Sequence, residues 1–201
     1  MKCYVILNGE KLNNFQIEEN SFIIATDGGY EFCKERNLKV DLVVGDFDSL
    51  GYAPAGSKIF PVEKDLTDGE IALNEAEKLG YKKVEFLCGG GGREDHLICN
   101  LKLLEIANKM GIFATLSTNY SKIFYVENNF EIKVEKNSFV SILPVYDSLI
   151  ESSVGLKYEY NNTKVSRAST LGISNVAIGE EISLNLAYGG VYIFINYEKI
   201  A

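Results

Sequence analysis

The chain has 201 residues, of which 46% are hydrophobic and 24% are charged, and its formal net charge is −8. This length is enough for one ample domain or two small ones, and the hydrophobic fraction is typical of a folded protein. The excess of acidic residues argues against nonspecific binding of nucleic acid through a basic surface. No apolar run approaches the roughly 20 residues that span a membrane, and the first apolar run is too short for a signal peptide.

The cysteines indicate the redox state of the cellular compartment. Cys3, Cys33, Cys88 and Cys99 form no CxxC pair and lie inside apolar periodic segments. This pattern predicts buried thiols in a reducing compartment, rather than a zinc site or a disulfide framework. We therefore expect a soluble cytoplasmic protein with no membrane or nucleic-acid partner.

The first 119 residues predict alternating strands and helices. Thr67 fits a helix N-cap, Glu70 is its capping-box partner, and Gly80 ends that helix. Two more helices are predicted, over 30–37 and from Arg93 to about Lys109. The second is expected to bury one face, with Leu97, Leu101, Leu104 and Ala107. Continuous apolar runs, typical of a parallel sheet covered on both faces, predict strands at 3–7, 21–26, 41–46, 58–62, 82–88 and 112–117. The pattern predicts an α/β fold with a Rossmann-like, mostly parallel sheet and flanking helices.

Beyond about Asn119 the helical periodicity stops. Short runs that alternate apolar and polar residues predict antiparallel strands at 122–127, 130–135, 138–145, 156–160, 181–187 and 191–198. No flexible linker separates the two parts. We predict two domains: an α/β domain at 1–119, and a β-sandwich at 120–201.

Two carboxylates follow the apolar run at 41–46. Asp46 and Asp48 are one residue apart at a predicted strand end, so their side chains would point the same way. They would repel each other unless a cation lay between them or one stayed protonated. Ligand sets made only of oxygen favour Mg²⁺, which commonly bridges to phosphate oxygens. A solvated acidic turn is the alternative interpretation.

Further polar residues surround the next two helix starts. Asp68 lies in a first helical turn, where the helix dipole alone is enough to explain a carboxylate. Lys64 and Asp65 could contact phosphate and orient a partner, or form an ordinary surface ion pair. Gly89 to Gly92 could present backbone N–H groups to an anion, or could be only a mobile loop.

The predicted helix that starts at Arg93 has a polar face. Arg93, His96 and Asn100 share this face, which could equally be solvated surface. His96 is not assigned as a catalytic base. Neither a P-loop nor a GxGxxG pattern is present in the glycine-rich segment before this helix.

Six motifs in order resemble the thiamine pyrophosphokinase family. They are DGG at 27–29, GDFDS at 45–49, KDLTDGE at 64–70, GGREDHLICN at 91–100, GLKY at 155–158 and GISN at 172–175. The resemblance implies that the α/β domain at 1–119 is catalytic and binds the nucleotide, and that the β-sandwich at 120–201 binds thiamine and forms the dimer. It also implies a homodimer with sites between subunits. It also implies transfer of pyrophosphate from the co-substrate ATP to the hydroxyl of thiamine, which releases AMP.

The resemblance also implies roles for individual residues. Asp46, Asp48 and Asp68 would hold Mg²⁺ against the triphosphate and act in catalysis. The nucleotide side would be lined by Asp27, Gly28, Gly29, Lys64, Asp65, Gly90 and Gly91.

For thiamine, the resemblance implies a second set of residues. Arg93 and Asp95 would meet thiamine and the transferred group, and both would be catalytic. Ser174 and Asn175 of the partner subunit would close over thiamine. Some family members stack a C-terminal tryptophan on thiamine, but this chain has no tryptophan. The aromatic residues in the corresponding region are Tyr188, Tyr192 and Phe194.

Two other functions compete with this interpretation. A haloacid-dehalogenase-like phosphatase would use Asp46 as nucleophile and Asp48 as acid and base. The glycine before Asp46, the late position of this pair and the β-rich end of the chain count against that enzyme. A non-catalytic sensor of a nucleotide or a thiamine compound is the other alternative, although it has little need for three metal carboxylates.

Overall fold

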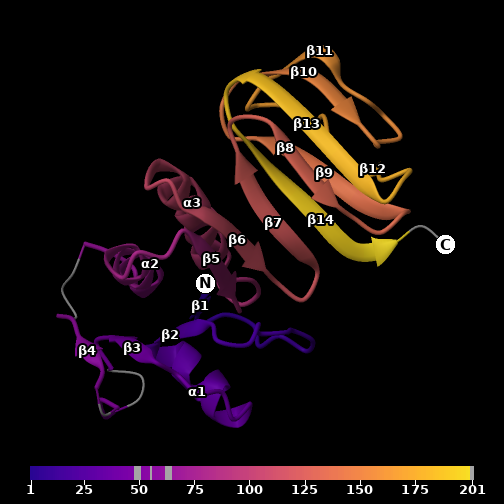
Figure 1. Ribbon diagram of the computed structural model, residues 1–201. Helices are drawn as coiled ribbons and strands as arrows, with labels where there is room; N and C mark the ends of the chain where they lie inside the picture. Colours follow the sequence, from indigo (N-terminus) through magenta and orange to yellow (C-terminus); the bar gives the residue numbers. More distant parts are fainter. Residues whose placement is uncertain (48–50, 55, 62–64, 200–201) are drawn as a thin grey trace. The chain divides into compact units, whose positions relative to one another are not determined.

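The computed structural model describes residues 1–47, 51–54, 56–61 and 65–199. The chain forms two compact units, Met1–Asn119 and Tyr120–Ala201, and the functions predicted for the two domains stay predictions. The N-terminal unit contains β1 (Cys3–Ile6), β2 (Phe22–Thr26), α1 (Asp27–Glu35), β3 (Leu42–Gly45), β4 (Lys58–Ile59), α2 (Asp68–Lys78), β5 (Lys83–Leu87), α3 (Glu94–Lys109) and β6 (Phe113–Ser117) (Figure 1).

The strands of the N-terminal unit pair in the order β6-β5-β1-β2-β3-β4, and every pair is parallel. From β1 the chain adds strands outward to β4, and it then returns to place β5 on the other side of β1. The strand order therefore reverses between β1 and β5. In open α/β sheets such a reversal leaves a crevice beyond the carboxyl ends of the strands, where ligands bind.

The central strands β1, β2 and β3 are almost wholly buried because helices pack against the sheet, whereas both residues of β4 are exposed. All four residues of β1 are buried. Its Tyr4 and Ile6 belong to one apolar cluster with Phe32 and Cys33 of α1. The helix α2 contacts β1, β2, β3 and α3, and α3 also contacts β6. The predicted α/β fold with a parallel sheet is confirmed.

Helix α1 begins at Asp27, earlier than the predicted start at Tyr30. The cause is Thr26, whose Oγ1 accepts a hydrogen bond of 3.3 Å from the N–H of Gly29 and so caps the helix. Gly28 and Gly29 thus form a first helical turn rather than a turn before a helix. A Cβ on Gly29 would lie 2.1 Å from the carbonyl oxygen of Ile6, so only glycine lets α1 approach β1 this closely.

Helix α2 starts as predicted. Thr67 is its N-cap, and the side-chain oxygen of Thr67 accepts from the N–H of Glu70 at 3.3 Å. The helix begins at Asp68, and Gly80 follows its end with a φ of 83°, in the left-handed region that favours glycine.

In the first half of α3, the residues that are buried differ from those predicted. Leu104 and Ala107 are buried as expected, whereas Leu97 and Leu101 are only half-buried and Leu103 is buried instead. Cys99 is exposed, so the prediction of four buried thiols is wrong for this residue. The reason is local: the first turns of α3 border an open cleft, and only the later turns lie over a closed core.

The reactivity of the four cysteines should show directly that Cys99 is exposed and the other three are buried. Cys3, Cys33 and Cys88 are buried, and burial raises the pKa of their thiols to about 12, about 12 and about 11. We expect an aromatic disulfide reagent at neutral pH to modify one thiol quickly in the native protein and four after unfolding. The Cys99→Ser variant should lose the fast phase, and a fast phase that persists in this variant would contradict the burial.

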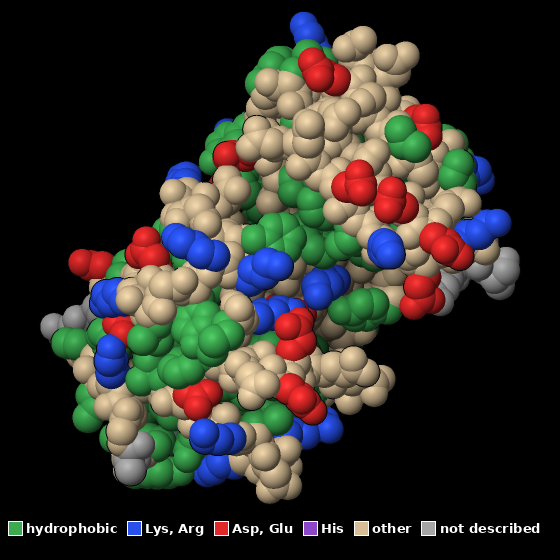
Figure 2. All heavy atoms as spheres, viewed as in Figure 1, with side chains coloured by type: hydrophobic (Ala, Val, Ile, Leu, Met, Phe, Trp, Pro, Cys, Tyr) green, Lys and Arg blue, Asp and Glu red, His purple; other side chains and the backbone are tan. Residues whose placement is uncertain are grey.

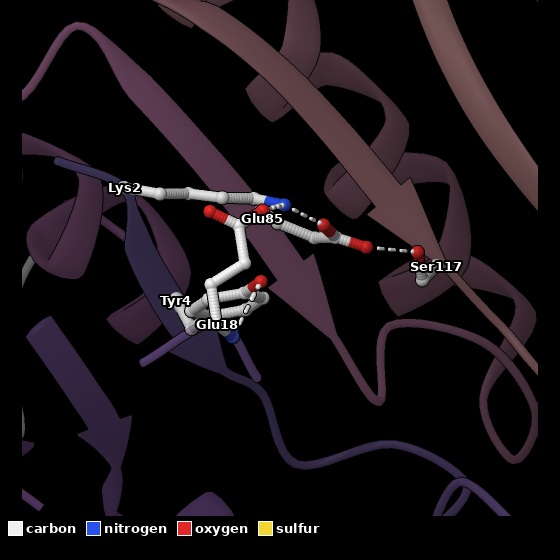
Figure 3. Close-up of polar contacts among 5 residues, drawn as sticks. All are labelled: Lys2, Tyr4, Glu18, Glu85 and Ser117. Carbon is white, nitrogen blue, oxygen red and sulfur yellow. Dashed lines mark hydrogen bonds and ion pairs between the residues drawn. The ribbon is translucent and has the colours of Figure 1, made fainter. Parts of the chain in front are cut away.

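A buried carboxylate anchors the N-terminal strand (Figure 3). Glu85 of β5 receives the Nζ of Lys2 at 2.6 Å on Oε2 and the hydroxyl of Ser117 at 2.6 Å on Oε1. Lys2 also reaches Glu18 at 3.1 Å. Burial alone lowers the pKa of Lys2, but the hydrogen bond and the charge of Glu85, with smaller contributions from Tyr4 and Glu18, outweigh it and raise that pKa. A cation and a hydroxyl thus satisfy the buried carboxylate.

The C-terminal unit is antiparallel throughout. Its strands pair in the orders β12-β9-β14-β7 and β11-β10-β13-β8. Apolar residues of both sheets, such as Phe124, Ile142, Ile150 and Leu184, form one core, so the predicted β-sandwich is confirmed. The strands are β7 (Ser121–Val126), β8 (Phe130–Lys133), β9 (Ser138–Pro144), β10 (Ser148–Val154), β11 (Asn161–Val165), β12 (Asn175–Val176), β13 (Glu181–Tyr188) and β14 (Val191–Lys199).

One predicted strand of this unit is wrong. Residues 156–160 form a loop between β10 and β11, with a single bridge from Leu156 to Ala177. Gly155 ends β10 because its φ of 86° leaves the extended region, and a Cβ there would lie 2.2 Å from the carbonyl oxygen of Glu181. The strands β10, β11 and β12 were not predicted, since their sequences are polar or very short.

The surface of the described residues mixes charge and apolar groups. Figure 2 shows acidic and basic side chains interspersed on one face, with hydrophobic side chains exposed between them. Within the described part of the chain, no helix is long and apolar enough to cross a membrane.

Candidate active site

A cleft of about 690 Å³ lies in the N-terminal unit, where the strand order reverses. The loops after β1 and β5 line it, together with the junction of β2 and α1 and the first turns of α2 and α3. This is the position expected for the ligand site of an open parallel sheet. Of the predicted site residues, the cleft brings together Asp27, Asp68, Gly91, Arg93 and Asp95.

Three helices begin at this cleft. Their N-cap residues, Thr26, Thr67 and Arg93, all line it. The first turn of a helix carries N–H groups without helical partners and the positive end of the helix dipole. Arg93 makes no side-chain cap, but the N–H of His96 in the first turn of α3 donates to Oδ1 of Asp95 at 3.0 Å. Three such starts around one hollow favour a ligand with several negative charges.

The glycine-rich loop after β5 is fixed beside the loop after β1. Gly91 and Gly92 have φ values of 70° and 68°, and a Cβ on Gly91 would lie 2.5 Å from the Cβ of Glu10. The N–H of Glu10 donates to the carbonyl oxygen of Gly90 at 2.6 Å. This close pairing shows that the loop has a defined path, which the alternative of a mobile loop did not predict.

Asn100 supports the same loop from α3. Its Nδ2 donates to the carbonyl oxygen of Gly89 at 2.9 Å, and its side chain borders the cleft. His96 also lines the cleft and is exposed. The polar face of α3 therefore faces the cleft and is more than a solvated surface.

Arg93 and Asp95 form a two-pronged ion pair at the mouth of the cleft. The Nε of Arg93 donates to Oδ1 of Asp95 at 3.1 Å, and its Nη2 donates to Oδ2 at 2.5 Å. The hydrogen bonds from Arg93 lower the pKa of Asp95, and the N–H of His96 adds to this effect. Both side chains are exposed, so the pair contributes little to stability and can open when an anion binds.

The acidic residues divide between the cleft and its border. Asp27 is 4% exposed, and Asp68 is the first residue of α2; both line the cleft. Asp46 follows β3, is half-buried and does not line the cleft, although a Cβ on Gly45 would lie 2.9 Å from the Cβ of Asp27. Asp48 lies outside the described residues. In the described ranges, no three histidine, cysteine or acidic residues come close enough to hold a metal ion.

Several predicted nucleotide contacts lie elsewhere. Gly28 and Gly29 form the first turn of α1, Asp65 is exposed before α2, and Gly90 is buried beneath its loop. None of these four lines the cleft, and Lys64 lies outside the described residues.

The two predicted thiamine contacts of the C-terminal unit are held by hydrogen bonds. Ser174 has a φ of 56°, and its N–H donates to the hydroxyl of Ser141 at 3.1 Å. Asn175 is 3% exposed and begins β12, and its side chain is bonded to the backbone of Tyr158.

Sequence reasoning missed the loop after β1. Asn8, Gly9 and Glu10 line the cleft, but none of them was selected from the sequence. A turn directly after a buried parallel strand was the signal that could have found them, because every such turn lies at the carboxyl edge of the sheet.

The chain matches two family models. One describes the catalytic domain of thiamin pyrophosphokinase and matches residues 15–115, which include every cleft residue outside the loop after β1. The other describes the vitamin B1 binding domain of thiamin pyrophosphokinase and matches residues 128–189. The chain belongs to the thiamine pyrophosphokinase family.

Individual members of the thiamine pyrophosphokinase family agree with this assignment. Thiamine pyrophosphokinase of Bacillus subtilis (strain 168) is 28% identical over 184 residues, which cover 86% of each chain. The crystal structure of thiamine pyrophosphokinase from Bacillus subtilis has a TM-score of 0.88 at 24% identity and covers 98% of this chain and 100% of its own. That from Geobacillus thermodenitrificans has a TM-score of 0.86 at 25% identity and covers 98% of both chains.

The family also decides between the competing functions. Both family models and the curated relative are thiamine pyrophosphokinases, so they favour neither a haloacid-dehalogenase-like phosphatase nor a non-catalytic sensor. The fold extends to a eukaryotic member, thiamin pyrophosphokinase from Candida albicans, with a TM-score of 0.76 at 18% identity over 98% of this chain and 90% of the other. The resemblance to thiamine pyrophosphokinase inferred from six motifs is confirmed.

Proposed function

We propose that this chain is an enzyme that transfers the β,γ-pyrophosphoryl group of ATP to the hydroxyl of thiamine. The products are thiamine diphosphate and AMP. The observation that carries the proposal is the convergence of three helix starts on a cleft that also holds Arg93. Membership of the thiamine pyrophosphokinase family identifies the reaction that such an anion site serves.

The chemistry requires positioning and charge neutralisation more than covalent catalysis. The oxygen of the thiamine hydroxyl forms a bond to the β-phosphorus, and the bond between that phosphorus and the oxygen bridging to the α-phosphate breaks. AMP leaves with the bonding electron pair, and the hydroxyl proton passes to a carboxylate or to solvent. In this scheme the helix starts and the backbone N–H groups near Gly91 and Gly92 hold the phosphates.

Arg93 is the group that we assign to the developing negative charge. Its guanidinium is exposed in the cleft and is held by Asp95 in a fixed orientation. When phosphate oxygens replace Asp95, the guanidinium can donate the same pair of parallel hydrogen bonds to them. We assign Asp95 to orienting Arg93 and, as the family suggests, to contacting thiamine.

We infer that Mg²⁺ is the metal and that Asp46, Asp48 and Asp68 hold it. Their carboxylate oxygens fit this hard cation, and Asp68 together with buried Asp27 brings acidic oxygens into the cleft. When bound, Mg²⁺ would neutralise part of the triphosphate charge. Asp27 and the loop at 89–92 are assigned to the nucleotide side, together with Gly28, Gly29, Lys64 and Asp65.

The proposal includes assembly and location. We propose a homodimer in the cytoplasm, in which Ser174 and Asn175 belong to the thiamine site. Family membership supports this arrangement. Sedimentation equilibrium should give about twice the monomer mass of 22.4 kDa, and a monomer at micromolar concentration would contradict the dimer.

An assay for thiamine diphosphate tests the proposed function. The protein is incubated with ATP, Mg²⁺ and thiamine, and thiamine phosphates are separated after oxidation to fluorescent thiochromes. Thiamine diphosphate should accumulate only when all three are present, and chelation of the metal should stop it. Phosphate release without thiamine would favour the phosphatase, and binding without turnover would favour the sensor.

A further inference from the structure

Glu10 has a fixed backbone position in the loop after β1. Its N–H donates to the carbonyl oxygen of Gly90 at 2.6 Å, and the N–H of Gly9 donates to that of Cys88 at 2.8 Å. Two backbone hydrogen bonds therefore join this loop to the chain that leaves β5. Glu10 is thus held at a defined place on the wall of the cleft.

Asn119 holds the same loop just beyond Glu10. Its Nδ2 donates to the carbonyl oxygen of Lys11 at 3.0 Å, and its Oδ1 accepts from the N–H of Asn13 at 2.9 Å. Because Asn119 lies two residues after β6, the chain segments that follow β5 and β6 both fix the loop. A group on so rigid a base can meet a substrate in one orientation, as catalysis requires.

The side chain of Glu10 lies over Gly91. A Cβ on Gly91 would lie 2.5 Å from the Cβ of Glu10 and 3.0 Å from its Oε2, so any larger residue there would displace the carboxylate. Gly91 and Gly92 belong to the loop that we assign to the phosphates, and Arg93 follows them directly. The carboxylate of Glu10 therefore lies beside the proposed site of the transferred group.

The cations near Glu10 are paired with other carboxylates. Lys11 pairs with Glu35 at 2.5 Å, and Arg93 pairs with Asp95. In the part of the chain that the structure describes, no hydrogen bond or ion pair reaches the carboxylate of Glu10. A carboxylate beside a bound phosphate repels it unless a proton or a cation lies between them. The reaction itself supplies a proton there, because the attacking hydroxyl must lose one beside the β-phosphorus.

The other acidic residues that line the cleft are engaged elsewhere. Oδ1 of the buried Asp27 accepts a backbone N–H at 2.5 Å. Hydrogen bonds from Arg93 lower the pKa of Asp95, which makes this carboxylate a weaker base. Asp68 is assigned to Mg²⁺, and the charge of a bound cation likewise makes a carboxylate a weaker base. A general base needs an accessible lone pair within reach of the proton, and Glu10 keeps one.

We propose that Glu10 accepts the proton of the thiamine hydroxyl during pyrophosphoryl transfer. This inference rests on the proposed function and names the carboxylate that takes part in it. The hydroxyl proton moves to an oxygen of Glu10 while the hydroxyl oxygen forms its bond to the β-phosphorus. AMP leaves with the electron pair of the broken bond between phosphorus and the bridging oxygen. Glu10 then releases the proton to solvent, to which it is exposed.

The test compares Glu10→Gln with wild type in steady-state assays of AMP formation. Glutamine keeps the size of the side chain but is not a base, so kcat should fall about 100-fold, as is typical when a general base is lost. KM for ATP and for thiamine, and the Mg²⁺ concentration that gives half the maximal rate, should stay within about twofold. Glu94→Gln is the matched control, because it removes an exposed carboxylate next to Arg93 that does not line the cleft. It should keep kcat within about twofold.

A small carboxylate in solution separates proton transfer from a structural role. Glu10→Ala leaves space over Gly91, where added formate can enter and accept the proton. Formate should raise kcat of this variant at least about tenfold, whereas chloride at the same ionic strength should not. Formate should leave the rate of wild type unchanged, because Glu10 already fills the position. If formate does not raise the rate of Glu10→Ala, Glu10 is not the proton acceptor.

The outcomes separate this inference from the function on which it rests. If wild type forms thiamine diphosphate but Glu10→Gln keeps kcat within about tenfold, the inference is wrong and the function stands. A higher KM for thiamine or a higher Mg²⁺ requirement, with little change in kcat, would overturn it too and would make Glu10 a contact to thiamine or to the metal. If wild type forms no thiamine diphosphate, both proposals fail.

Discussion

Arg93→Ala is expected to lower kcat for AMP formation by about 10³-fold, because an arginine that neutralises a transferring phosphoryl group commonly contributes that much. Its guanidinium is exposed at the start of α3, in the cleft that the starts of α1 and α2 also line. Thermal unfolding should not change, since its ion pair with Asp95 is at the surface. Arg93→Lys should recover only part of the rate, because an ammonium lacks the planar fork.

The matched control is Lys109→Ala, which removes an exposed cation from the last residue of the same helix. It should keep kcat within about twofold of wild type. If Arg93→Ala also kept kcat within about tenfold, the assignment of Arg93 to the transferred group would be wrong.

Asp68→Asn is expected to lower kcat at least about 100-fold, because it removes the charge of a proposed metal ligand and keeps its size. The helix start should survive, since Thr67 provides the cap and Asp68 is only the first helical residue. Binding of a non-hydrolysable ATP analogue, measured by calorimetry, should lose most of its dependence on Mg²⁺. This measurement needs no turnover, so it tests the metal role independently of the reaction.

Glu70→Gln is the control for this experiment. Glu70 lies in the same helical turn and carries the same charge, but it does not line the cleft. Asp68→Asn with wild-type kcat and wild-type Mg²⁺ dependence would show that Asp68 only stabilises the start of its helix.

Much of the fold could be predicted from local patterns. The strands at Cys3–Ile6 and Leu42–Gly45 are buried on both faces, and continuous apolar runs report this directly. The start of α2 followed from the Thr67 cap. The start of α1 did not, because Asp27-Gly28-Gly29 has the composition of a turn, and the Thr26 cap and the close approach to Ile6 appear only in the structure.

The polar strands of the β-sandwich could not be predicted from local sequence patterns. Asn161–Val165 is mostly exposed, and its pairing with β10 rather than its side chains makes it a strand. For residues 156–160 a strand was predicted that does not form. Their apolar and polar residues alternate as in a strand, but the positive φ of Gly155 ends the extended backbone before them. Strand pairing depends on partners far away in the sequence, and one chain alone does not reveal them.

The candidate site shows the same limit. Asp68 and Arg93 could be selected from the sequence because each lies in a motif that resembles the thiamine pyrophosphokinase family. Glu10 was not selected, although it follows the turn after a buried strand, because the pairing of two loops at Gly90 that fixes its place at the cleft is visible only in the structure. The hydrogen bonds between the Asn175 side chain and the backbone of Tyr158 also appear only in the three-dimensional structure. Neither the GLKY motif nor the GISN motif by itself predicts a contact with the other.

The central claim is that two phosphorus atoms move together from ATP to thiamine. The direct test uses ATP labelled at the β-phosphorus, with Mg²⁺ and thiamine, and follows the label by chromatography. The proposed function predicts that the label appears in thiamine diphosphate and that AMP forms one-for-one with it. A label that stays in ADP while thiamine monophosphate forms would contradict pyrophosphoryl transfer and show a phosphoryl transfer instead.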